Sequence, residues 1–286
     1  MAKQNTPQLV YIAIDTKIDN DTILPLLKIF SGHRKNSNGC QVSGTVFTPS
    51  VGNDPTFVKT LQSQGAHIAG RGGNIHDSYS GSILRSKVSE QLAVLRSSLS
   101  PSASGWRGLA SMSPTDDVLQ ALVDLNVTYD SSVVSDQQTH VWPYTLDFGL
   151  GDKCSINENS CPKGRYPGLW EVPIKPLQLP KKYQGQSGGY ECFFLDYCPG
   201  MADSHENIKE LLDWNFRKHY DGHRTPFGIN LRESWFVKRS NKESSLQGLT
   251  DFLDGVLSHD DVIILSIEQM LYWMKTSSQP LVSMGC

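Results

Sequence analysis

The chain has 286 residues, of which 38% are hydrophobic and 19% charged, and its formal net charge is -3. This composition is typical of a soluble globular protein that is long enough to bury a large core. The absence of long basic runs argues against nucleic-acid binding, and no apolar stretch approaches the ~20 residues of a membrane helix.

Predicted strands and helices alternate along the chain. The first strand, 9–16, is an apolar run that ends in a carboxylate and a hydroxyl, Asp15 and Thr16. The next predicted elements are helix 18–30, strand 42–47, helix 55–64, strand 67–69, a glycine-rich loop 70–74, helix 83–99, strand 105–107, helix 115–125 and strand 127–130. A loop-rich segment follows over about 135–205, with one brief strand at 170–172. The later elements are helix 206–220, strand 227–231, helix 246–257, strand 262–265 and helix 267–274. This order predicts an α/β fold in which a parallel sheet closes into a barrel.

Such a barrel would gather the carboxyl ends of its strands at one rim, where α/β folds bind ligands. The residues predicted at this rim are Asp15, Thr16, Arg71, Arg107, Asp130, Glu171, Arg232 and Glu233. The set contains three arginines and no histidine. Arginine stays protonated and holds carboxylates by paired hydrogen bonds, so an ion-pair network is the simplest expectation. Asp15 has a second interpretation, as the cap of the helix that follows it.

Six cysteines bear on the compartment of the protein. Cys154 and Cys161 form one close pair and Cys192 and Cys198 another, and neither pair has the spacing of a zinc site. We predict a disulfide within each pair and a third between Cys40 and Cys286, which indicates an oxidising compartment. Free thiols in a cytosolic protein are the alternative.

Two further features concern secretion. Met1 to Asn5 is polar and shows no signal peptide, so the protein is either intracellular or secreted with its leader removed. Two glycosylation sequons, which start at Asn20 and Asn126, agree with secretion.

Several segments together resemble the invertebrate chitin deacetylases of the polysaccharide deacetylase superfamily (NodB-like, carbohydrate esterase family 4). They are FSGHRKNSNGC at 30–40, VWPYTL at 141–146, PGLWEVP at 167–173 and NFRKHY at 215–220 with RTPFG at 224–228. The resemblance spans about residues 9–276. It implies a single domain over 1–286 with a distorted (β/α)7-type barrel and a loop-rich insertion at about 135–205.

The motifs of the active enzymes are altered in this chain. In the family's TFDD motif the first aspartate is the general base and the second binds the metal, and here these positions are Asp15 and Thr16. The two metal-binding histidines of HSxxH align with Arg71 and Ile75, although a one-residue shift brings His76 near the second place. Arg107 keeps the arginine that steadies the base.

Two more motif positions follow further along the chain. Asp130 lies in a retained YDS segment, and Arg232 replaces the histidine that acts as general acid.

These changes remove the chemistry that a metal-dependent deacetylase needs. Isoleucine has no lone pair, a neutral hydroxyl is a poor zinc ligand, and a guanidinium ~4 Å from a dication would be repelled by roughly 8 kcal/mol at an effective dielectric of ~20. We therefore expect no cofactor, with the zinc site lost. We also expect Arg71 to pair with Asp15, and Arg232 to pair with Asp130 or Glu233.

The expected function is that of a secreted, catalytically inactive homologue that binds chitin or a related polysaccharide, with extracellular matrix proteins as further partners. Trp142, Tyr144 and Trp235 are the candidate sugar-stacking side chains, and core packing is the alternative role for each. Two other functions stay open. One is a surviving deacetylase with a rearranged site that uses Asp15, His76 and His140, and the other is a binder of anionic ligands in an arginine-lined cleft.

Overall fold

A computed structural model describes residues 6–72, 81–108, 114–135, 141–150, 161–179, 191–198, 204–237 and 242–276. Its strands are β1 (Gln8–Asp15), β2 (Gly44–Thr48), β3 (Ala66–Arg71), β4 (Gly105–Arg107), β5 (Tyr129–Asp130), β6 (Tyr144–Leu146), β7 (Tyr166–Glu171), β8 (Leu177–Gln178), β9 (Glu191–Cys192), β10 (Phe227–Arg232) and β11 (Val262–Leu265). Its helices are α1 (Ile23–Ile29), α2 (Pro55–Ser63), α3 (Gly81–Ser98), α4 (Asp116–Asp124), the 3-10 turn η3 (Leu195–Tyr197), α5 (His205–Tyr220), α6 (Glu233–Val237), α7 (Lys242–Val256) and α8 (Ile267–Lys275).

The main sheet is a distorted barrel, as predicted, but it is open where closure was expected. Its hydrogen-bonded order is β10-β1-β2-β3-β4-β5-β7-β6, and only β6 runs antiparallel to its neighbour. β11 also pairs with β1, along its first half, while β2 pairs along its second half. Among the described strands no ladder joins β6 or β7 back to β10, so hydrogen bonds do not close the barrel.

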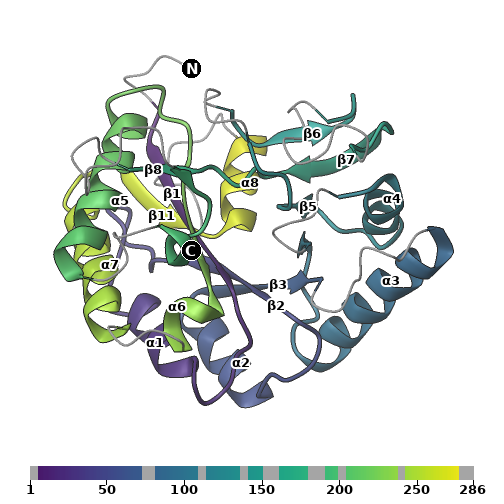
Figure 1. Cartoon of the computed structure of the whole chain (residues 1–286), viewed down its shortest axis with the longest axis horizontal. Coiled ribbons are helices and arrows are strands. Elements are labelled where there is room, and N and C mark those ends of the chain that lie inside the picture. The colour runs from purple at the N-terminus through teal and green to yellow at the C-terminus, as the bar shows by residue number, and fades with distance from the viewer. Residues whose placement is uncertain are drawn as a thin grey trace.

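The two faces of β1 belong to two separate cores. Val10, Ile12 and Ile14 pack with the surrounding helices, which lie outside the strands in Figure 1. Leu9, Tyr11 and Ala13 pack instead with α8 and with inner-face residues of the other strands. Because side chains alternate along a strand, Asp15 follows the second series and lies on the inner face.

Glycine makes room for the large side chains of this inner core. A Cβ atom at Gly228, the register partner of Tyr11, would come within 2.3 Å of that tyrosine ring. A Cβ at Gly105 would likewise lie 2.0 Å from the ring of Tyr129. The barrel is therefore filled at these levels, and its functional groups lie at its ends.

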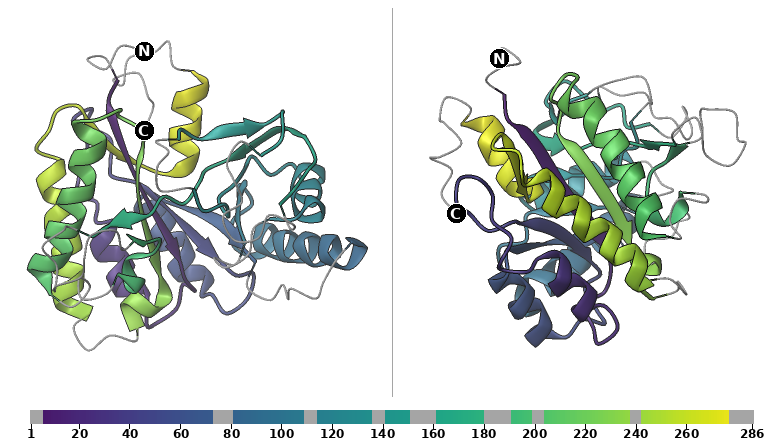
Figure 2. Two further views of the ribbon diagram at one scale, coloured as in Figure 1. Left: turned by 45° about the horizontal axis from the view of Figure 1, so that its top comes forward. Right: turned by 90° about the vertical axis from the view of Figure 1, so that its left-hand side faces the viewer.

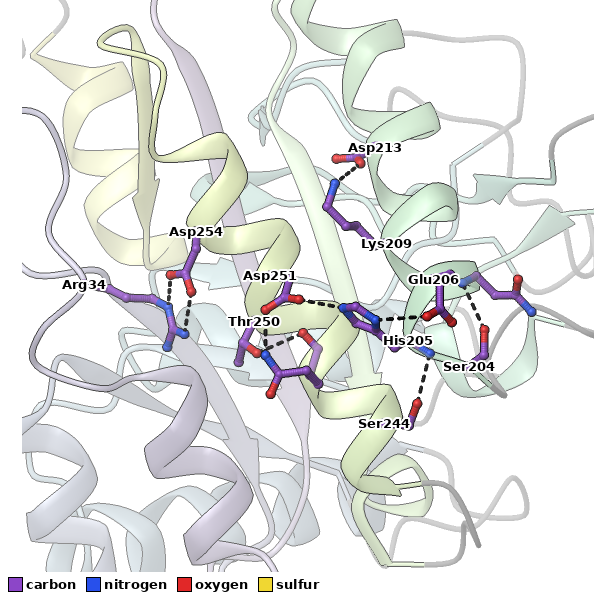
Figure 3. A network of polar contacts seen from close by, with 12 residues as sticks. Arg34, Ser204, His205, Glu206, Lys209, Asp213, Ser244, Thr250, Asp251 and Asp254 are labelled. Atoms are coloured by element: carbon purple, nitrogen blue, oxygen red, sulfur yellow. Dashed lines mark hydrogen bonds and ion pairs between the residues drawn. The ribbon is translucent and has the colours of Figure 1, made fainter.

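Helices α5 and α7 pack side by side against β10 and β11, as Figure 2 shows. Their apolar contacts are bordered by polar ones near the start of α5 (Figure 3). His205 lies 2.6 Å from Asp251 on α7, and its backbone N–H donates to the Ser244 hydroxyl. Ser204 caps α5 by accepting from the N–H of Asn207.

The element boundaries differ from the prediction in a few places. The first helix begins at Ile23 and not at 18, because a turn over 19–22 bonds Thr22 and Ile23 to the carbonyl of Asp19. β3 continues through Gly70 and Arg71, which were predicted as loop. The segment predicted to be loop-rich also contains the short strands β6, β8 and β9.

Candidate functional site

Strand register brings four of the predicted residues to one end of the inner face. Asp15 pairs in register with Arg232 on β10, and Arg71 on β3 pairs with Arg107 on β4. Each of these residues ends its strand. Register partners in a parallel sheet point to the same face, so the prediction that they share a rim is confirmed.

Asp15 forms a buried ion pair with Arg107. Arg107 Nη1 donates to Asp15 Oδ1 over 3.0 Å, and the two side chains are 0% and 2% exposed. The guanidinium also donates to the carbonyl and hydroxyl of Ser131 and to Asn230 Oδ1. The ring of Phe47 lies 4.1 Å below it. Arg107 therefore fixes the Asp15 carboxylate, which is the role that the resemblance implies for it.

This arrangement corrects two expectations about Asp15. The predicted ion pair between Asp15 and Arg71 is not formed, and the Asp15 carboxylate pairs with Arg107 instead. Asp15 does not cap the following helix either, since the N-cap residue of α1 is Thr22. Asn230 was missed by the sequence interpretation, although it lies in the same strand as the predicted Arg232.

Thr16 is buried and already committed to local hydrogen bonds. Its hydroxyl donates to the carbonyl of Lys17 over 2.8 Å, and its backbone N–H donates to the carbonyl of Phe47. This geometry anchors the turn after β1.

Arg71 is the third arginine of the rim, and it differs from the other two. It is partly buried, and its Nε atom is shielded from solvent and makes no hydrogen bond with the residues that the structure describes. No ion pair to Arg71 is formed within the described ranges. Ile75, His76 and His140 lie outside those ranges.

Arg232 has a partner that the sequence did not suggest. Its Nε and Nη2 both donate to the carboxylate of Asp196, the closest contact being 2.7 Å. Ser234 donates to the same carboxylate over 2.5 Å. The predicted partners, Asp130 and Glu233, are wrong, and Glu233 accepts from the backbone N–H of Lys17.

The disulfide between Cys192 and Cys198 explains why Asp196 reaches this position. It closes a short loop that contains η3, and its formation confirms one of the three predicted disulfides. Cys40 and Cys161 are also disulfide-bonded. Their predicted partners, Cys286 and Cys154, lie outside the described residues, so those two pairings stay predictions.

Asp130 forms no ion pair with the rim arginines among the described residues. It is the register partner of Trp106, whose side chain belongs to the outer core, so it lies on the other face of the sheet from Asp15. Burial raises the pKa of Asp130, while hydrogen bonds from Ser132 and Glu171 oppose the rise. Glu171 is its register partner on β7.

The predicted aromatic side chains fall into two groups. Trp235 is 1% exposed and packs edge-to-face on Phe236 in the outer core, so its predicted role in stacking on sugars is wrong. Trp142 and Tyr144 are partly exposed, and each packs against one of the two cores. Both keep surface that a ligand can reach.

The described residues at the rim do not fit the zinc ion that the resemblance implies. Thr16 and Arg71 offer no histidine nitrogen or carboxylate at the expected ligand positions. In the described part of the chain, no group of three or more histidine, cysteine, aspartate or glutamate side chains is placed to hold a metal ion. Within the same residues, no helix has the length and apolar character of a membrane span.

Comparisons with curated proteins give two related chitin deacetylases from Bombyx mori. The chain is 23% identical to Chitin deacetylase 1 over 283 residues, and 24% identical to Chitin deacetylase 8 over 291 residues. Both matches cover 95% of the chain, but only 52% of the first protein and 71% of the second. The chain thus spans about half the length of the first relative. No family model matches it.

Solved structures agree on the fold. The polysaccharide deacetylase structure from Mycobacterium smegmatis aligns with a TM-score of 0.59 at 14% identity, over 94% of this chain and 92% of that one. The Puue allantoinase structure aligns with a TM-score of 0.62 at 14% identity, over 97% of this chain and 93% of that one. The chain is therefore a distant homologue of the chitin deacetylases, with the distorted barrel fold of the polysaccharide deacetylases.

Proposed function

We propose that this chain is a catalytically inactive chitin deacetylase homologue that binds chitin or a related polysaccharide. The observation that carries the proposal is the partnership of Arg232. At the position where the resemblance implies a catalytic histidine, a guanidinium is held through two nitrogens by Asp196. An arginine in this state cannot donate a proton to a leaving amine.

The other half of the ancestral site supports the same proposal. Asp15 and Arg107, to which the resemblance assigns the roles of the base and of the arginine that steadies it, form a hydrogen-bonded pair. A base without a metal-activated water has no nucleophile to generate. The proposed loss of the zinc site therefore makes the retained Asp15 a structural residue.

We place the protein outside the cell, with matrix components as its partners. The Cys192–Cys198 disulfide favours an oxidising compartment. Asn20 and Asn126, which start the two sequons, are both exposed, as glycosylation requires. Trp142 and Tyr144 remain the predicted side chains for stacking on sugar rings.

Two assays on the same purified protein test the proposal. The first measures retention on insoluble chitin, with an unrelated protein of similar isoelectric point as the control. The second measures acetate release from acetylated chitin oligomers with added zinc, with an active chitin deacetylase as the control. We expect retention without acetate release. Acetate release would favour the alternative of a deacetylase with a rearranged site, and absence of retention would reject glycan binding.

Arg71 supports a second candidate function, the binding of an anionic ligand. Arg107 and Arg232 are neutralised by Asp15 and Asp196, whereas Arg71 has no ion pair with any described residue. A carboxylate-bearing sugar at the rim could therefore pair with Arg71 alone. Retention on a uronic-acid polymer, lost in Arg71→Gln, would support this function. Equal retention of both proteins would reject it.

A further inference from the structure

We propose that Tyr197 is a stacking platform for a sugar ring at the rim of the barrel. The ligand class is a neutral pyranose, such as one unit of an N-acetylated glucosamine chain. This inference rests on the proposed glycan-binding function and assigns that function a specific side chain.

The ring of Tyr197 is held in place from one side. Arg232 Cζ lies 3.8 Å from the ring centroid, a short distance for a guanidinium stacked on an aromatic face. The same guanidinium is fixed by its paired hydrogen bonds to Asp196, the residue before Tyr197. It also lies 4.8 Å from the centroid of Phe194, which is buried. The ring therefore rests on an ordered base.

The chain on both sides of the ring is also constrained. Cys192 and Cys198 close the loop by their disulfide. Within it, the backbone N–H of Tyr197 donates to the carbonyl of Phe194, and that of Cys198 donates to Leu195. A side chain ordered before binding loses less conformational entropy when a ligand arrives.

The platform lies at the end of the barrel where ligands are expected. Arg232 ends β10 and is the register partner of Asp15, which ends β1. Ser234, which follows on α6, bonds to the same Asp196 carboxylate that precedes Tyr197. Tyr197 is thus a neighbour of the rim that holds Asp15 and Arg107.

The exposure of Tyr197 indicates which surface is free. The residue is 65% exposed although Arg232 covers one ring face, so the opposite face and the edge carry the exposed area. An aromatic ring face presents the negative side of its quadrupole. The C–H groups along one side of a pyranose are weakly positive and apolar, and they complement such a face.

Tyr197→Ala tests the platform, with Tyr272→Ala as the matched control. Tyr272 is similarly exposed, at 60%, but lies on α8 beside His67 and Thr128, at the amino ends of β3 and β5. The probe is a soluble tetramer of N-acetylglucosamine, titrated into the disulfide-bonded full chain. We expect Tyr197→Ala to weaken its affinity roughly tenfold, as truncation of a central aromatic contact does, while Tyr272→Ala and Tyr197→Phe keep the wild-type affinity.

The outcomes separate this inference from the proposed function. Wild-type binding that Tyr197→Ala leaves unchanged would overturn the platform and leave glycan binding intact. Absence of binding by the wild-type chain, to the tetramer and to insoluble chitin alike, would overturn both. Equal weakening by Tyr197→Ala and Tyr272→Ala would also contradict the platform, because it would show a general effect of lost surface aromatics.

Discussion

Asp15 and Arg232 are register partners at the ends of β1 and β10, yet they do not pair with each other. The Asp15 carboxylate accepts a hydrogen bond from Arg107 on β4, and the Arg232 guanidinium donates to Asp196 in the disulfide loop. Asp15 and Arg232 are thus each paired with a residue distant in sequence. This arrangement is how the barrel accommodates an arginine where the resemblance implies a histidine.

Arg107→Met should destabilise the protein strongly. The change leaves the Asp15 carboxylate buried without its partner, which costs about 3–5 kcal/mol for a buried pair. Urea unfolding monitored by circular dichroism measures the loss. Lys209→Met is the matched control, because it breaks the partly exposed pair with Asp213 and should change stability by less than about 1 kcal/mol. Similar losses in the two variants would refute a central role for the Asp15–Arg107 pair.

Joint replacement of Cys192 and Cys198 by serine should affect both stability and glycan binding. Loss of a disulfide that closes so short a loop is expected to cost about 2 kcal/mol of unfolding free energy. Because the same loop holds Asp196 and Tyr197, affinity for the N-acetylglucosamine tetramer should fall as well. Thermal unfolding and a binding titration measure the two effects. Unchanged affinity in a folded variant would show that the disulfide does not order the platform.

Local sequence patterns predicted the fold well but not the partners of the rim side chains. Short apolar runs predict the strands, and the shared rim follows from parallel topology, which is why Asp15, Arg71, Arg107 and Arg232 were placed together correctly. Which side chain each rim residue pairs with depends on tertiary contacts. Asp196 lies in a loop segment with no regular pattern, and the disulfide and the packing of η3 hold it beside Arg232.

The same limit explains further errors. Trp235 was predicted to stack on a sugar ring, but in helix α6 its side chain packs into the outer core. Asp130 also ends a strand, and it lies on the opposite face because side chains alternate and its register partner is Trp106. Sequence position near a strand end therefore does not fix the direction of a side chain.

Asp130→Asn should change how stability depends on pH. Burial raises the pKa of Asp130 above its ordinary value of 3.8, so the folded protein retains this proton to a higher pH than the unfolded chain. The stabilisation is fully present below about pH 3.8 and is lost as pH rises through the raised pKa. Glu171 faces Asp130 across the strand pair, and Arg107 opposes the rise electrostatically.

The asparagine variant carries no titrating group at position 130, so it should gain stability relative to the wild type as pH rises. Urea unfolding of both proteins from pH 4 to pH 8 gives the difference. A difference that stays constant over this range would mean that the native pKa of Asp130 is not raised.

His205→Gln should also change how stability depends on pH. His205 is a basic residue, but its pKa is raised like that of Asp130, so its contribution to stability is also lost as pH rises. The hydrogen bond to Asp251 raises the pKa of His205 above 6.5 (Figure 3). The ion pair thus stabilises the fold fully below about pH 6.5, and its contribution is lost as pH rises through the higher native pKa. The wild type should lose stability relative to His205→Gln between pH 6 and pH 9. Parallel stability curves for the two proteins would contradict an ion pair between α5 and α7.

The proposed function depends on loss of the zinc site, and a zinc titration measures that loss directly. Isothermal titration of zinc into the metal-free, disulfide-bonded protein at neutral pH, with an active chitin deacetylase as the positive control, measures the stoichiometry. We predict no stoichiometric binding, since the described rim carries Thr16, Arg71 and the Arg232–Asp196 pair in place of ligands and acid. One tightly bound zinc ion per chain, lost on replacement of Asp15 by alanine, would contradict the proposed loss of the zinc site.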